Sequence, residues 1–140
     1  MLRVLASLAV AQANFYVIGD WGGESSSNPA NAGERAVAKG MAARGSPEFV
    51  LAVGDNFYEY GLEPSSYVDR FQETFETVFT AKTLDVPFYA LCGNHDHRGN
   101  VQVQVQYAKN ESSRWTMPDL FYTFTREVHP EGCQTCESTK

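Results

Sequence analysis

The sequence predicts an α/β domain built around a parallel β-sheet. Three short apolar runs are rich in aromatic and β-branched residues, and stretches with helical periodicity separate them. The order strand, helix, strand, helix, strand is typical of right-handed β-α-β units, whose strands lie parallel in one sheet. The 140 residues are enough for one domain of ordinary size.

The first part of this pattern covers residues 14–44. Residues 14–19 (NFYVIG) form a short apolar run and predict a buried strand. Residues 22–29 are small and polar, so they predict a loop. Residues 31–44 predict a helix, because Val37 and Met41 lie one turn apart and a Gly-Ser-Pro stop follows.

The second part contains two further strands and the clearest helical pattern. Residues 49–53 (FVLAV) predict the second strand, and residues 87–92 (PFYALC) predict the third. Residues 65–79 lie between them and carry apolar side chains at alternating spacings of three and four, which places these side chains on one helix face. The side chains of this face are Val68, Phe71, Phe75, Val78 and Phe79. We interpret them as the core-facing side of a helix.

Two more strands are predicted after the third run. Residues 101–106 (VQVQVQ) alternate strictly between apolar and polar, which favours a half-exposed strand. Residues 120–125 (LFYTFT) are rich in aromatic and β-branched residues and predict another strand. Residues 127–140 form a tail without a recognisable pattern.

Composition and charge narrow the functional classes. The hydrophobic fraction is 43% and the charged fraction 20%, as in globular proteins rather than disordered ones. The net charge of -6 argues against nucleic acid as the main partner. It leaves a phosphate substrate open, because bound metal ions can reverse the local sign. We expect no membrane span, since no apolar run approaches the ~20 residues that one needs, and the oligomeric state is not predicted.

The N-terminus favours a secreted or lysosome-like location. Residues 1–13 combine Arg3, an apolar run and a small-x-small end at Ala13, and this predicts a short signal peptide. The alternative is an ordinary N-terminal strand or tail. Asn110 begins an Asn-Glu-Ser sequence, an N-glycosylation acceptor if the signal works and a chance match if it does not.

The three cysteines predict neither a zinc site nor a redox site. Cys133 and Cys136 have C-x-x-C spacing, but no second pair completes a zinc site and no β-α context supports a redox motif. A disulfide in the tail, or two unpaired thiols, is the simplest interpretation. Cys92 lies in the third apolar run and is expected to be a small buried residue.

Each of the three apolar runs is followed by glycine and then by residues that can bind metal. The carboxyl ends of parallel strands meet at one edge of a sheet, which is where α/β proteins bind ligands. We call the segments that follow the three runs the first, second and third motif loops. They read Gly19-Asp20-Trp21-Gly22-Gly23, Gly54-Asp55-Asn56-Phe57-Tyr58 and Gly93-Asn94-His95-Asp96-His97.

Metal binding explains why such residues would gather. Carboxylates packed together repel one another, and a bound cation removes that penalty. Oxygen and imidazole ligands suit iron, zinc or manganese. A single aspartate at a strand end is usually a turn or helix-cap residue, but three successive loops of this kind indicate a metal site.

The three motif loops resemble the first three motifs of metallophosphoesterases. The position of Tyr58, three residues after Asp55, resembles the pattern of the purple acid phosphatase branch of that superfamily. The surrounding sequence is similar to the tartrate-resistant acid phosphatases at residues 86–89, 99–101 and 114–118, and the resemblance covers about residues 15–125. It implies a metallophosphoesterase α/β/β/α sandwich, of which this chain holds the N-terminal βαβαβ half. It also implies a helix, not a strand, after the third motif loop.

The resemblance further implies a role for individual residues in a binuclear metal site. Asp20 would bind a ferric ion, and Asp55 would bridge that ion to a divalent metal, which is Fe(II), Zn or Mn. Tyr58 would bind the ferric ion as a phenolate, and Asn94 would bind the divalent metal. Without the resemblance, Tyr58 would most simply be a partly buried core aromatic.

The resemblance implies an acid phosphatase that hydrolyses phosphate monoesters with metal assistance. His95 would steady the phosphate and protonate the leaving alkoxide. His97 would line the substrate pocket, although alone it would be interpreted as a solvated loop residue. Asp96 is expected to orient His95 or its loop rather than to bind metal.

The sequence departs from this family in its histidines. Family members complete both metal sites with histidines in later motifs, whereas the only histidine here beyond the third motif loop is His129, which matches none of them. We therefore expect residues 14–126 to be the N-terminal part of a metallophosphoesterase domain and the chain to be a fragment. The alternative is a truncated, non-catalytic product. A nucleotide-binding domain is disfavoured, because no glycine-rich phosphate loop follows the first run.

Overall fold

The sheet has four parallel strands in the order β1-β2-β3-β4. The computed structural model describes residues 14–126, so the predictions for residues 1–13 and 127–140 lie outside the described part. The three apolar runs form the first three strands, which confirms the predicted parallel sheet. The strands are β1 (Phe15–Ile18), β2 (Phe49–Ala52), β3 (Phe88–Ala90) and β4 (Trp115–Thr116).

Helices connect the strands. Helix α1 (Ala32–Ala43) begins where the Asn31 side chain accepts a hydrogen bond from the Glu34 amide at 2.9 Å. Helix α2 (Tyr67–Phe71) continues into a π-helical turn, η1 (Gln72–Glu76), so the predicted helix is present with a widened turn. The remaining helical segments are η2 (Lys82–Leu84), η3 (Asp96–Arg98) and α3 (Gln102–Asn110).

The hydrophobic core lies between the sheet and the helices. Alternate strand residues such as Val50, Ala52 and Phe88 are buried in one cluster with side chains from all three α-helices. Trp115 of β4 packs against the Phe71 ring at a centroid distance of 5.1 Å. The predicted apolar stripe of the second helix therefore faces the core, as expected.

The opposite side of the sheet is not covered by helices. Phe49 is buried there among the rings of Phe15, Tyr89 and Phe124. The other apolar side chains of this side are half-buried or exposed, although they alternate with the core residues along the same strands. We call this surface the open face and define it by Phe15, Val17, Leu51, Val53, Tyr89 and Leu91.

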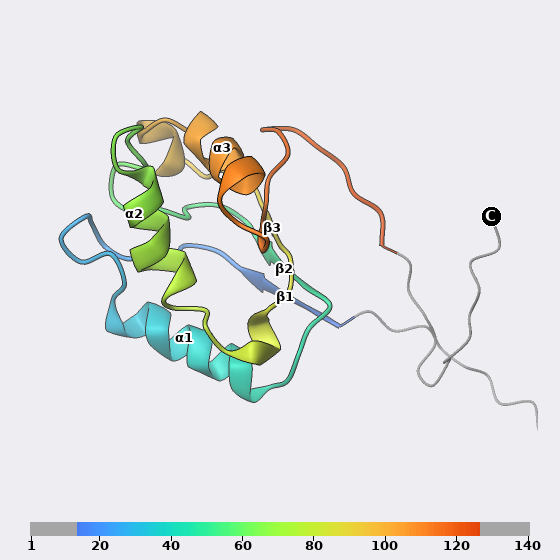
Figure 1. Cartoon of the computed structure of the whole chain (residues 1–140). Coiled ribbons are helices and arrows are strands. Elements are labelled where there is room, and N and C mark those ends of the chain that lie inside the picture. Colours follow the sequence, from blue (N-terminus) through green and yellow to red (C-terminus); the bar gives the residue numbers. More distant parts are fainter. Residues whose placement is uncertain (1–13, 127–140) are drawn as a thin grey trace, which may run out of the picture.

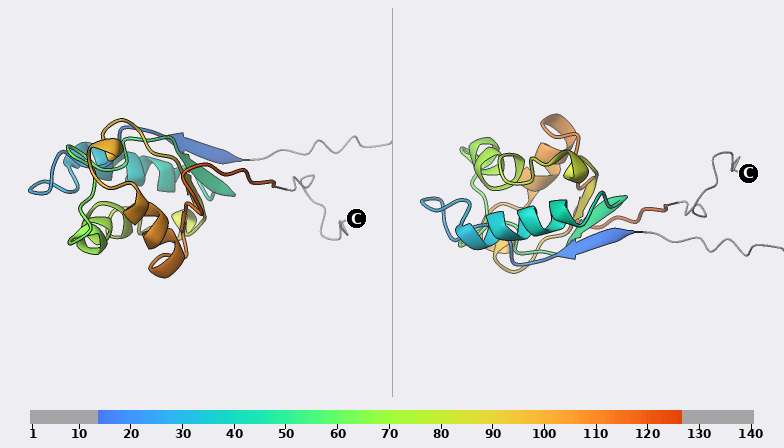
Figure 2. Two further views of the ribbon diagram at one scale, coloured as in Figure 1. Left: turned by 90° about the horizontal axis from the view of Figure 1, so that it is seen from above. Right: turned by 90° about the horizontal axis from the view of Figure 1, so that it is seen from below.

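The carboxyl ends of the strands point to one end of the molecule. In the views of Figures 1 and 2, β1 points toward the loop that leads into α1, while the described chain begins and ends on the opposite side. The motif loops therefore lie at one edge of the sheet. Within residues 14–126, no helix has the length and apolar character needed to cross a bilayer.

The prediction of a strand at residues 101–106 is wrong, because most of these residues belong to α3. Val103, Gln104 and Tyr107 are buried, a spacing that fits a helix. The alternation of valine and glutamine suggested a strand with one polar face, but Gln104 is a core residue. It hydrogen-bonds to other buried polar groups instead of facing water. The helix that the family resemblance implied is confirmed.

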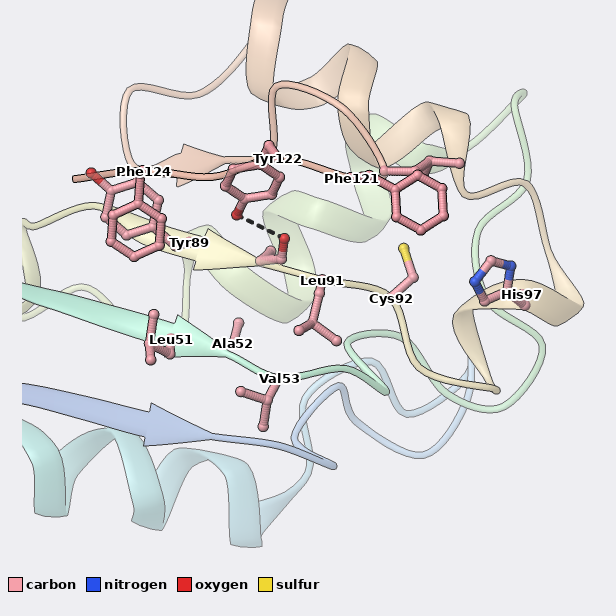
Figure 3. A pocket seen from close by; sticks show the side chains of 12 residues that line it. Leu51, Ala52, Val53, Tyr89, Leu91, Cys92, His97, Phe121, Tyr122 and Phe124 are labelled. Carbon is pink, nitrogen blue, oxygen red and sulfur yellow. Dashed lines mark hydrogen bonds between the residues drawn. The ribbon is translucent and has the colours of Figure 1, made fainter.

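The prediction of a strand at residues 120–125 is also wrong. The free edge of β3 pairs instead with β4, and the Phe88 amide donates to the Arg114 carbonyl at 2.7 Å. The segment after β4 attaches through side chains. The Tyr122 hydroxyl donates to the Ala90 carbonyl at 2.9 Å, and Phe124 stacks on Tyr89 with ring centroids 3.9 Å apart (Figure 3).

Candidate metal centre

The first two motif loops leave the sheet through sharply turned aspartates. Asp20 and Asp55 have φ angles of 55° and 51°, in the left-handed region that aspartate tolerates better than most residues. The second and third loops touch directly, since a Cβ atom on Gly93 would lie 2.3 Å from Asp55 Oδ1. Glycine at this position therefore permits the approach that places the loops side by side.

The Tyr58 hydroxyl lies between the two aspartates. It donates to Asp20 Oδ1 at 2.7 Å and is 3.1 Å from Asp55 Oδ2. The first and second motif loops thus bring two carboxylates and a phenol to one point. Such hard oxygen donors fit a cation like ferric iron.

The surroundings of Tyr58 favour its neutral form when no cation is bound. Desolvation raises the pKa of Tyr58, and its hydrogen bonds to Asp20 and Asp55 raise it further, as do the charges of these carboxylates. A bound cation would oppose this effect, because it would neutralise the carboxylates and stabilise the phenolate.

His95 lies against the same group. Its backbone amide donates to Asp55 Oδ1 at 2.9 Å, and its ring centroid is 4.3 Å from that of Tyr58. His95 Nδ1 lies 2.8 Å from the Glu59 carbonyl oxygen. A carbonyl only accepts, so Nδ1 carries the proton of this hydrogen bond and Nε2 is the nitrogen left for other partners.

The other two candidates of the third motif loop are exposed. No hydrogen bond joins the Asn94 side chain to another described residue. His97 lines one end of a cavity of about 540 Å³ between the open face and the segment that carries Phe121 and Phe124 (Figure 3). The structure thus groups Asp20, Asp55, Tyr58 and His95 by direct contact, and it places Asn94 and His97 nearby without such contacts.

The buried side chain of Asp96 connects the second and third motif loops. It is fully buried, and its carboxylate accepts hydrogen bonds from the Gly93 amide at 2.8 Å and from Gln104 Nε2 at 3.0 Å. The amides of Asn56 and Phe57 also donate to it. Burial raises the pKa of Asp96, while the hydrogen bonds from Gly93, Asn56 and Gln104 lower it. These contacts fit the expectation that Asp96 organises its loop.

Asn56 continues this network into the core. Its amide oxygen accepts from Trp21 Nε1 at 3.1 Å, and its amide nitrogen donates to the Leu91 carbonyl at 2.8 Å. It therefore links all three motif loops, since Trp21 belongs to the first and Leu91 precedes the third. Asn56 lies inside the second motif, so its position in the sequence offered a signal for this role.

Arg70 of α2 was not singled out from the sequence. Its guanidinium donates to the carbonyl of Gly22 at 3.0 Å, to that of Tyr58 at 2.7 Å and to that of Ser25. The helical pattern around it gave no signal for this role, because charged residues usually lie on the solvated side of a helix.

The donor set is partial within residues 14–126. Among these residues, no group of three or more His, Cys, Asp or Glu side chains is arranged to hold a metal ion. The oxygen donors of Asp20, Asp55 and Tyr58 fit a hard cation in chemistry, and further ligands would be needed to hold it tightly.

Comparison with known proteins identifies the family of this chain. The profile of the calcineurin-like phosphoesterases matches residues 13–131. The chain belongs to this family. It is 44% identical over 126 residues to the human tartrate-resistant acid phosphatase type 5, a match that covers 87% of this chain and 38% of the relative.

Further relatives extend the comparison. Purple acid phosphatase 3 of Arabidopsis thaliana is 41% identical over 95 residues, which cover 66% of this chain and 24% of that protein. A solved structure described as GAP50, the anchor in the inner membrane complex of Plasmodium, aligns with a TM-score of 0.64 at 22% identity. It covers 81% of this chain and 36% of that chain, and this likeness shows the fold alone. This chain thus spans less than half the length of the curated relatives that it matches.

Proposed function

We propose that the protein is a metal-dependent phosphomonoesterase of the acid phosphatase type. The observation that carries this proposal is the Tyr58 hydroxyl held between the carboxylates of Asp20 and Asp55. The identity to tartrate-resistant and purple acid phosphatases supports it. The substrate class is a phosphate monoester.

The proposed centre is binuclear, with Fe(III) and a divalent metal that is Fe(II), Zn or Mn. Asp20 and Tyr58 would hold the ferric ion, Asp55 would bridge the two ions and Asn94 would hold the divalent one. When bound, such ions supply Lewis acidity and a nucleophile derived from water near neutral pH. The Asp55 carboxylate can serve both ions because it has two oxygens.

The histidines would act on the substrate. His95 would act through Nε2, because its Nδ1 proton is held by the Glu59 carbonyl. In the doubly protonated form, Nε2 can steady a phosphoryl oxygen and donate a proton to the leaving alkoxide. His97 would line the substrate pocket, since it is exposed in the same loop as His95.

We also propose a secretory route, with the protein secreted or in a lysosome-like compartment. The predicted signal peptide supports it. Asn110 supports it too, because the residue is exposed at the end of α3, where a glycan can be attached.

A second candidate function is a non-catalytic chain that binds metal weakly. The incomplete donor set among residues 14–126 favours it. Each ion would then retain too few protein ligands to be held tightly.

The test is expression of the parent protein that contains this sequence with Fe(III) and Zn(II), followed by measurement of bound metal and of p-nitrophenyl phosphate hydrolysis. We expect bound iron and hydrolysis in the unsubstituted parent protein, which would supply the ligands that residues 14–126 lack. Asp55→Ala should abolish both, because it removes the bridging ligand, and Asp119→Ala is the matched control on an exposed loop. Iron binding without hydrolysis would favour the second candidate, and no iron binding would contradict the proposed centre.

A further inference from the structure

We propose that Arg70 is a positioning residue that fixes Tyr58 relative to Asp20 in the metal site. This inference rests on the proposed function for its consequence, but the contacts that carry it exist in the metal-free chain. Arg70 touches no proposed metal ligand through that ligand's side chain. It acts on the backbone of the two motif loops that present them.

The Arg70 guanidinium connects two loops that are far apart in the sequence. One Nη atom donates to the Gly22 carbonyl at 3.0 Å and to the Tyr58 carbonyl at 2.7 Å. The other donates to the Ser25 carbonyl. Gly22 and Ser25 follow Asp20 in the same loop, so the guanidinium sets the spacing between that loop and Tyr58.

Tyr58 is consequently held on both sides of its backbone. Its amide donates to the Gly22 carbonyl at 3.1 Å, and its own carbonyl accepts from Arg70. With the backbone fixed, only the two side-chain torsions of Tyr58 remain to place the hydroxyl. Because that hydroxyl is 2.7 Å from Asp20 Oδ1, a shift of the backbone would separate the two groups.

Arginine is suited to this position for a physical reason. Its side chain is only 7% exposed, and its planar guanidinium offers several donors in a fixed geometry. Lysine has one nitrogen on a flexible stem and cannot reach carbonyls in different directions at once. The same helix adds a second anchor one turn later, where the Thr74 hydroxyl donates to the Pro29 carbonyl at 2.7 Å.

Arg114 provides a matched control. It is also largely buried, and its guanidinium donates to the carbonyls of Phe79 and Leu84 and to the Glu76 carboxylate. None of these partners belongs to a motif loop. Arg114→Lys therefore tests the loss of a buried guanidinium anchor without a direct effect on the site.

The first measurement uses NMR on the metal-free 140-residue chain. Arg70→Lys should speed hydrogen exchange of the Tyr58 amide about 10-fold or more, since its local opening becomes easier. It should also weaken nuclear Overhauser contacts between the Tyr58 ring and Asp20. Arg114→Lys should leave both unchanged. Equal changes in the two variants, or no change in Arg70→Lys, would overturn the proposal.

Two further measurements keep the test decisive. In the unsubstituted chain, through-hydrogen-bond couplings should connect the Arg70 guanidinium to the Gly22 and Tyr58 carbonyls, and their absence would overturn the proposal even if Arg70→Lys does not fold. In a Fe(III) titration, Arg70→Lys should lose the tyrosinate-to-iron absorption band that the Arg114→Lys chain keeps. If no chain binds iron but the NMR effects are present, the proposed function fails and the positioning of Tyr58 by Arg70 stands.

Discussion

At the scale of single residues, polar groups beneath the motif loops determine how the site is built. Asp96 is fully buried, yet every hydrogen-bond partner it has among the described residues is an N–H donor. A carboxylate satisfies such a set of donors, because it can only accept. Its charge is compensated by amide dipoles rather than by a neighbouring cation in the chain.

Asp96→Asn should therefore destabilise the fold. The new amide group would turn a donor toward backbone N–H groups and leave at least one of them unsatisfied. We expect a loss of about 2–4 kcal/mol in the free energy of unfolding, measured by urea denaturation. Asp119→Asn is the control, since Asp119 is exposed and, among residues 14–126, its side chain accepts only from the Leu120 amide. Equal losses in the two variants would show that the buried network contributes nothing specific.

At the scale of the elements, α1 contributes a buried carboxylate with no compensating hydrogen bond. Glu34 is 4% exposed, and neither carboxylate oxygen has a hydrogen-bond partner among the described residues. Burial raises the pKa of Glu34 to about 8, although the charges of Arg35 and Arg70 act in the opposite direction. The folded chain therefore holds this carboxyl in its neutral form near neutral pH.

The raised pKa predicts stability that falls with increasing pH. Below about 4.5, Glu34 is protonated in both the folded and the unfolded chain. Between that value and about 8, the unfolded chain releases the proton and the folded chain retains it, so unfolding becomes easier. The free energy of unfolding should fall by about 2–4 kcal/mol between pH 5 and pH 8.

Glu34→Gln should remove this component of the pH dependence, because an amide does not titrate. Urea denaturation at pH 5 and pH 8 is the measurement, and the variant should be the more stable chain at pH 8. Glu48→Gln serves as the control, since Glu48 is exposed just before β2. If Glu34→Gln and Glu48→Gln follow the same pH profile, the carboxyl of Glu34 is not buried as described.

At the scale of the whole molecule, the sheet separates a packed side from the open face. Val17 and Leu91 are about half exposed, and the cavity of about 540 Å³ lies over β2 and β3 (Figure 3). The α/β/β/α sandwich that the family resemblance implies would place a second sheet over this face. The described residues alone leave an apolar surface that water contacts.

A dye that fluoresces on apolar surfaces, such as ANS, should bind the open face of the chain. Val17→Lys should reduce this fluorescence several-fold, because it places a charge at the centre of β1 on that side. Val37→Lys is a matched control: Val37 is 48% exposed and Val17 is 55% exposed, but Val37 lies on α1, away from the open face. Equal reductions would locate the dye elsewhere.

The sequence by itself determined the first three strands, α1 and the place of the metal-binding candidates. Apolar runs such as residues 49–53 can only be buried strands or short helical pieces, and their length and β-branched content decide between these. Because parallel strands share an orientation, the residues that follow them must meet at one edge. The convergence of Asp20, Asp55 and Tyr58 is thus a consequence of the order of elements.

Only the tertiary structure decided which polar residues hold the site together. Arg70 is buried because it donates to carbonyls up to 48 residues away. Gln104 is buried because it donates to the Asp96 carboxylate and accepts from the Asn56 side chain, which is also 48 residues away. A local pattern cannot register such distant partners. The alternation of residues 101–106 therefore predicted an exposed Gln104, and nothing in the sequence singled out Arg70. The strand predicted at residues 120–125 is absent for a similar reason: the edge of β3 pairs with β4, a pairing that the local pattern does not show. The periodicity of a segment indicates which of its side chains can be buried. The rest of the fold decides which partners these side chains pack against.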